Sequence, residues 1–159
     1  MSGRVDPVPE GVSTVTPRLV FDDAAAAIDF YRDAFGAEVP FEPHTGPDGN
    51  VVHAEVRIGD SAVCVTDEGD DGNGVAPKSV DRRVTAIMAI NVPDVDQLWG
   101  RAVAAGCEVV YPLADQFYGE RSGRLRDPFG HQWMLSMHIE DVDRDEIDRR
   151  MQARSEEQT

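Results

Sequence analysis

The sequence has few cysteines, no long apolar run and half as many basic as acidic residues. Its two cysteines, Cys64 and Cys107, stand in unrelated contexts, so we expect buried thiols and no disulfide framework. No apolar run approaches the roughly 20 residues that cross a bilayer, and the first residues lack the charged-then-apolar pattern of a signal peptide. These absences predict a cytoplasmic protein that does not insert into a membrane.

The charge balance limits the partners of this acidic protein. Lys and Arg number 15 against 30 Asp and Glu, which gives a formal net charge of −15. Such a chain repels nucleic-acid phosphates and anionic membrane surfaces, so neither is expected as a partner. The acidic stretch "DEGDDGNG" (67–74) is interpreted as a solvated loop, because it lacks the ligand spacing of a calcium-binding EF-hand loop.

The length of 159 residues is sufficient for one domain with its own core. Residues 1–13 are rich in Pro, Gly and Val without a clear period, and are interpreted as a flexible arm. Residues 14–142 form the predicted domain. Residues 143–159 are expected to contain a short helix and a polar tail, with Asp143 and Glu146 as an N-terminal capping pair.

Two stretches have the apolar spacing of amphipathic helices. The first, residues 22–36, opens with two aspartates that are N-cap candidates and ends at Gly36. The second, residues 93–106, has its N-cap candidate at Asp94 and ends at Gly106. Both therefore carry start and stop signals at the expected places.

A repeat with a spacing of seventy residues relates the two helices. Both end on a similar phrase, "GAEV" at 36–39 and "GCEV" at 106–109. The same shift pairs Cys64 with Met134. Each helix follows one strand candidate and precedes three others, so the chain is interpreted as two β-α-β-β-β modules. The modules span about residues 14–67 and 84–138.

Three segments carry a resemblance to a known family. "IDFYRDAFGAE", "HAEVRIGDS" and "DQFYGERSGRLRDPFGHQW" resemble the PhnB-like branch of the glyoxalase/bleomycin-resistance/dioxygenase superfamily, also called the vicinal oxygen chelate superfamily. The resemblance covers about residues 14–142. It implies an α+β fold in which paired modules curl a mixed sheet into a cup, with the helices packed outside. It also implies a homodimer.

The resemblance further places four metal ligands on inward strand positions, which here are Thr16, Cys64, Ile87 and Met134. Isoleucine has no donor atom, and threonine and methionine are poor ligands for the ions concerned. We therefore expect no metal at these positions, no cofactor, and no classical metal-dependent glyoxalase or dioxygenase activity.

His53 and Glu55 lie two residues apart, on one face of a strand candidate. They are the candidates for a metal-free general base, or for a non-standard divalent site completed by His44 or His138. The alternative interpretation is a hydrogen-bonded polar pair inside the cup.

The remaining inward positions predict an organic-ligand pocket with a mostly apolar floor. Its aromatic residues would stack on a planar ligand, and an arginine would clamp an anionic group. The alternative, purely structural interpretation is that the arginines pair with surface acids and that Tyr118 stabilises a turn. The candidates are Cys64, Ile87, Gln116, Phe117, Tyr118, Arg121, Arg124 and Met134.

The sequence thus favours a protein that binds a small organic ligand in a cup without the usual metal ligands. Sequestration of a toxic compound, transport and sensing all fit this description. The second hypothesis is a lyase, isomerase or dioxygenase that uses a relocated metal or the His53/Glu55 base. The third is a structural or interaction protein with a vestigial cup.

Overall fold

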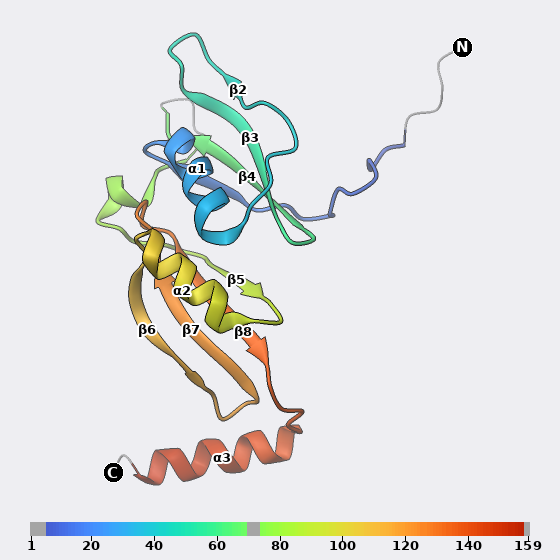
Figure 1. The fold of residues 1–159 in the computed structure, drawn as a ribbon, viewed down its shortest axis with the longest axis vertical. Helices are drawn as coiled ribbons and strands as arrows, with labels where there is room; N and C mark the ends of the chain where they lie inside the picture. Colours follow the sequence, from blue (N-terminus) through green and yellow to red (C-terminus); the bar gives the residue numbers. More distant parts are fainter. Residues whose placement is uncertain (1–5, 70–73, 158–159) are drawn as a thin grey trace. The chain divides into compact units, whose positions relative to one another are not determined.

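The computed structural model describes residues 6–69 and 74–157, drawn in Figure 1. The chain divides into two compact units, one ending at Arg83 and the other beginning at Val84. Parts of three predicted segments lie outside the described residues. They are 1–5 of the N-terminal arm, 70–73 of the acidic loop and 158–159 of the tail.

Both units have the order strand, helix, three strands. The first contains β1 (Arg18–Phe21), α1 (Ala24–Phe35), β2 (His44–Thr45), β3 (Val51–Ile58) and β4 (Ser61–Asp67), followed by the 3₁₀ turn η1 (Pro77–Val80). The second contains β5 (Ile87–Asn91), α2 (Val95–Ala105), β6 (Glu108–Asp115), β7 (Glu120–Arg126), β8 (Gln132–His138) and α3 (Arg144–Glu157).

The two sheets also share one topology. Their strand orders are β1-β4-β3-β2 and β5-β8-β7-β6. In each sheet the first strand runs parallel to the fourth and the other neighbours are antiparallel. The predicted pair of β-α-β-β-β modules and the α+β class are therefore confirmed.

Local capping fixes both helices at the predicted places. The Asp23 carboxylate accepts a hydrogen bond from the Ala26 N–H at 3.0 Å, and Asp94 caps α2 in the same way. Gly36 and Gly106 end the helices in the left-handed conformation, which costs glycine least. Each helix packs on one face of its own sheet (Figure 1).

The helix-facing sides of the strands form the core of each unit. Ala54, Val56, Val63 and Val65 are buried in the first, and Trp133 and Leu135 in the second, as strand alternation predicts. The same alternation along β3 predicts that Val52 is buried with Ala54 and Val56, but Val52 is 45% exposed and Val51 is buried instead. The cause is a bulge, since His44 faces His53 whereas Thr45 faces Val51, which shifts the alternation by one residue.

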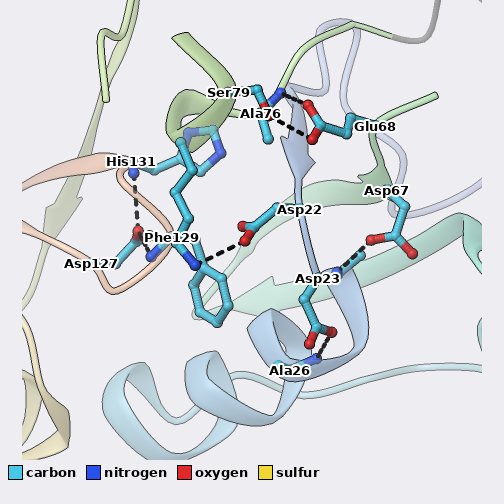
Figure 2. A network of polar contacts seen from close by, with 12 residues as sticks. Asp22, Asp23, Ala26, Asp67, Glu68, Ala76, Ser79, Asp127, Phe129 and His131 are labelled. Atoms are coloured by element: carbon cyan, nitrogen blue, oxygen red, sulfur yellow. Dashed lines mark hydrogen bonds and ion pairs between the residues drawn. The ribbon is translucent and has the colours of Figure 1, made fainter. Parts of the chain in front are cut away.

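Two carboxylates organise the loops around these sheets (Figure 2). In the first unit, Asp67 accepts hydrogen bonds from the backbone N–H groups of Ala24 and Val51, at 2.6 and 2.7 Å. It thereby ties the start of α1 to the start of β3. In the second unit, the buried Asp127 accepts from the N–H groups of Phe129 and His131, at 3.0 and 2.9 Å. Asp127 therefore acts in the turn before β8, as its Asp-Pro-Phe-Gly sequence predicts.

The C-terminal helix α3 is longer than the short helix expected from the sequence. Asp143 caps it by accepting from the Glu146 N–H at 2.9 Å, which confirms that capping pair. Arg150 holds α3 to the unit by bonding the Glu140 carboxylate and the carbonyl oxygen of Phe117. In the part of the chain that the structure describes, no helix is long and apolar enough to span a membrane.

Candidate functional site

The four positions that correspond to metal ligands carry side chains that do not fit a catalytic ion. Cys64 and Met134 are half-buried on β4 and β8, Thr16 precedes β1, and Ile87 opens β5 with 42% of its surface exposed. This set offers one hydroxyl, one thiol, one thioether and one hydrocarbon where a divalent ion needs imidazoles and carboxylates.

The His53/Glu55 pair does not form a mutual hydrogen bond. Glu55 instead accepts from the Arg57 Nε at 2.9 Å. The imidazole of His53 stacks beside two rings, with its centroid 5.9 Å from that of Phe41 and 6.1 Å from that of His44. The expected hydrogen-bonded polar pair of His53 and Glu55 is therefore wrong, because the neighbouring arginine takes the carboxylate.

The candidates for completing a non-standard metal site belong to different units of the chain. His44 is the cross-strand partner of His53 on β2, whereas His138 is on β8 of the second unit and contacts Asp141 at 2.8 Å. Among residues 6–69 and 74–157, no group of three or more His, Cys, Asp or Glu side chains is arranged to hold a metal ion.

The second unit contains a pocket of about 210 Å³ on the sheet face opposite α2. Four of the predicted ligand-binding residues line it together: Gln116, Tyr118, Arg124 and Met134. Arg124 of β7 and Met134 of β8 are directly opposite each other in the antiparallel register, so both side chains project from the same face. The pocket therefore joins an apolar floor to a cation.

Three further residues complete the pocket: Tyr111, Ser122 and Gly123. Tyr111 belongs to β6 and is the cross-strand neighbour of Arg124. Irregularities in the β6–β7 register on both sides of Tyr111 explain why alternation along β6 does not predict this position. Sequence reasoning missed Tyr111 and Ser122, although Ser122 lies two residues from Arg124 and so shares its face.

The guanidinium of Arg124 lies over the Tyr111 ring, 5.1 Å from its centroid. This cation–π contact orients the arginine. The Arg124 Nε is buried and has no hydrogen-bond partner within the described residues. The Nε of Arg126 is unpartnered in the same way, but of these two arginines only Arg124 lines the cavity. Its guanidinium, from which no described residue accepts a hydrogen bond, therefore offers donors to a ligand there.

Polar groups line the other side of the pocket. The Tyr118 hydroxyl and the Ser122 hydroxyl are 3.2 Å apart, and either can donate to the other. The Gln116 amide donates to the carbonyl oxygens of Ala114 and Ser122, both at 3.3 Å. These bonds fix the side chains beside the cavity, and the contact with Ser122 gives Tyr118 a role beyond the turn at Gly119.

Two predicted ligand contacts lie elsewhere. Arg121 is on the α2 side of β7, where it forms ion pairs with Asp96 at 2.7 Å and Asp115 at 2.9 Å. These hydrogen bonds raise its pKa above the usual value and lower that of Asp96. Phe117 contacts α3, with the Arg154 guanidinium 5.4 Å from its ring centroid. For Arg121, the alternative of pairing with surface acids is the one confirmed.

The other two predicted contacts do not line this pocket. Ile87 begins β5 and faces Gln132 in the parallel register. Cys64 belongs to the first unit, where it lies between Arg18 and Glu55 in the sheet register. The candidate site therefore consists of the residues around Arg124 in the second unit, with the His53 cluster as a separate feature of the first.

Comparison with known proteins agrees with this architecture. The family model of the Glyoxalase/Bleomycin resistance protein/Dioxygenase superfamily matches residues 12–135. The uncharacterized protein Rv0887c of Mycobacterium tuberculosis is 40% identical over 145 residues, which cover 89% of this chain and 84% of that protein.

Among solved structures, TioX from Micromonospora sp. ML1 is similar with a TM-score of 0.62 and 26% identity, over 80% of this chain and all of that one. The PhnB protein from Bacillus cereus has a TM-score of 0.60 at 17% identity, over 79% of this chain and 99% of that one. The similarity to the PhnB protein shows that the two proteins share a fold.

Proposed function

Because the chain belongs to the glyoxalase/bleomycin resistance protein/dioxygenase superfamily, we propose that it binds a small organic ligand in the pocket of its second unit, without an ion at the four usual ligand positions. One observation carries the proposal: side chains from β6, β7, β8 and the turn after β6 converge on one cavity of about 210 Å³. Such sites combine apolar walls with a few placed polar groups.

The composition of the pocket supports binding more directly than it supports chemistry. Met134 and Tyr111 offer apolar and aromatic surface, while Arg124, Gln116 and Tyr118 offer polar groups. The volume is below the roughly 300–1,000 Å³ of pockets for drug-sized ligands, which favours a small ligand. Sequestration of a toxic compound, transport and sensing are the roles that such binding would serve.

A thermal-shift screen with a small-molecule library tests the proposal. A ligand at 100 times its Kd should stabilise the protein by about 2.7 kcal/mol. Met134→Trp, which fills the pocket, should abolish the shift, whereas Met137→Leu, on the opposite face of the same strand, should keep it. A library without any stabilising compound would argue against ligand binding and for a structural protein.

The enzymatic alternative receives no support from contacts around the candidate base. Glu55 is held by Arg57, so its carboxylate is not aligned with the imidazole of His53. If a library compound were converted to a product, the alternative would be tested by His53→Ala and Glu55→Gln. Loss of turnover in both folded variants would establish the base, and full activity in both would reject it.

The homodimer implied by the family resemblance and the cytoplasmic location predicted from the sequence remain part of this proposal. Sedimentation equilibrium of the purified chain measures the first, since a dimer has twice the mass of 17.4 kDa. Cell fractionation measures the second. A monomer over the full micromolar range would reject the dimer without affecting the pocket.

A further inference from the structure

We propose that the ligand of the second-unit pocket is a small planar carboxylate, whose anionic group is held by the guanidinium of Arg124. This inference rests on the proposed function and specifies the chemical class of ligand. Three features of the structure support it: the missing partner of Arg124, the paired counterpart of this residue in the first unit, and the arrangement of groups around the cavity.

The first feature is an unusual electrostatic position for an arginine in so acidic a chain. The net charge is −15, so acidic partners are abundant. The other arginines of β7 form ion pairs: Arg121 with Asp96, and Arg126 with Glu108 at 3.4 Å. Within the described residues, half-buried Arg124 has no ion pair and its buried Nε has no hydrogen-bond partner. A partly desolvated cation of this kind gains most from a bound anion.

The second feature comes from the repeat. Cys64 and Met134, seventy residues apart, occupy the fourth strands of the two sheets. The residue opposite Cys64 is Glu55, and the residue opposite Met134 is Arg124. Glu55 and Arg124 thus hold the same register position with opposite charges. Glu55 is neutralised by Arg57 at 2.9 Å, whereas no residue that the structure describes forms an ion pair with Arg124, so an external carboxylate would fill the equivalent role.

The third feature defines the shape of the ligand. A guanidinium presents parallel N–H donors that match the two oxygens of a carboxylate. The Tyr111 ring fixes the plane of Arg124 from one side. The apolar body of the ligand would lie against Met134, and the Tyr118 and Ser122 hydroxyls border the same cavity. A cavity lined by one cationic side chain, Arg124, in an acidic protein favours a monoanion over a dianionic phosphate.

The test uses benzoate and benzamide, which have nearly the same shape but differ in charge. Binding is followed by the NMR signal of the ¹³C-methyl group of Met134, assigned with Met134→Leu. The variants are Arg124→Gln, Arg124→Lys and, as a matched control on the same strand, Arg121→Gln. The methyl signal of Met137, on the opposite face of β8, reports whether each variant remains folded.

The expected result is that benzoate shifts the Met134 signal in the wild type. Arg124→Gln should weaken benzoate binding by roughly ten- to hundredfold, the loss that follows from removing a charged hydrogen bond. The affinity of the Arg124→Gln variant for benzamide should equal that of the wild type to within about twofold, since binding of this neutral ligand does not depend on that charge. Arg124→Lys should recover only part of the affinity, because the lysine ammonium lacks the parallel N–H donors of a guanidinium. Arg121→Gln should bind benzoate like the wild type.

Other outcomes separate this inference from the proposed function. If benzamide bound as tightly as benzoate at Met134, the pocket would bind ligands but the carboxylate assignment would be wrong. If Arg121→Gln weakened benzoate as much as Arg124→Gln, the effect would be general charge and the assignment would again be wrong. If neither probe moved the Met134 signal, the inference would fail, and the library screen would decide the proposed function separately.

Discussion

Replacing Asp127 by asparagine should destabilise the protein far more than a change of one atom suggests. The buried carboxylate has Oδ1 facing the N–H groups of Phe129 and His131, and Oδ2 facing the Trp133 indole N–H at 2.9 Å. These three partners are all donors. The amide of asparagine has the same shape but only one acceptor oxygen, so at least one N–H must face another N–H.

The size of the effect follows from these contacts. If the asparagine oxygen keeps the two backbone donors, its NH₂ group faces the Trp133 indole. The bond to the indole is then lost, and two donors oppose each other in its place. Each unsatisfied donor costs about 1–3 kcal/mol. We therefore expect Asp127→Asn to lower the free energy of unfolding by about 2–4 kcal/mol. Trp133→Phe removes the opposing donor, so the two substitutions should be coupled by about 1–2 kcal/mol.

Urea unfolding followed by far-ultraviolet circular dichroism measures these values without depending on tryptophan fluorescence. The measurement is a double-mutant cycle of four proteins: the wild type, Asp127→Asn, Trp133→Phe and the double variant. A loss in Asp127→Asn below about 0.5 kcal/mol, or additive effects in the double variant, would refute the reasoning, because independent sites add within that margin.

Two further predictions use matched pairs of residues, and a third concerns the pH dependence of stability. Gly123→Ala should destabilise by about 1–3 kcal/mol through overpacking, because its Cβ would lie 2.6 Å from an indole carbon of α2. Gly100→Ala should stabilise α2 by up to about 1 kcal/mol, because its added Cβ would have no atom within 4 Å. Melting temperatures that shift in the same direction in both variants would contradict this prediction. Burial, with the charge of Asp127, raises the pKa of Cys107 from 9.0 to about 12, so a thiol reagent at pH 8 should modify half-exposed Cys64 and spare Cys107 until urea is added. The pKa of Cys107 is higher in the folded protein than in the unfolded chain. Its contribution to the free energy of unfolding is therefore complete below pH 9 and is lost as the pH rises toward 12. A Cys107→Ala variant that loses as much stability as the wild type over this pH range would refute the prediction.

The features predicted correctly from the sequence depend on local physics. The helix ends at Asp94, Gly36 and Gly106 follow from capping and left-handed glycine, which act within a few residues. The burial of Trp133 and Leu135 follows from strand alternation. The repeat then gives the module order, because the same elements recur in the same sequence.

The features missed depend on pairing between strands. The exposure of Val52 results from a bulge opposite the two-residue strand β2, which alternation within β3 does not reveal. The position of Tyr111 results from the irregular β6–β7 register. The separation of Arg121 from Arg124 had a usable signal, since residues three apart on a strand point to opposite faces. Applying that rule to residues 120–126 would have placed only one of them in the pocket.

The opposite charges at Glu55 and Arg124 have a consequence for evolution and engineering. A duplicated strand framework holds an acid in one copy and a base in the other, with little change in backbone register. In the proposed carboxylate site, ligand charge would therefore be set by one position, residue 124, where the fold accepts either sign of charge. A descendant of this chain with an acid at 124 would retain the aromatic and apolar walls but select amines, so a change of specificity would require one substitution and no new architecture.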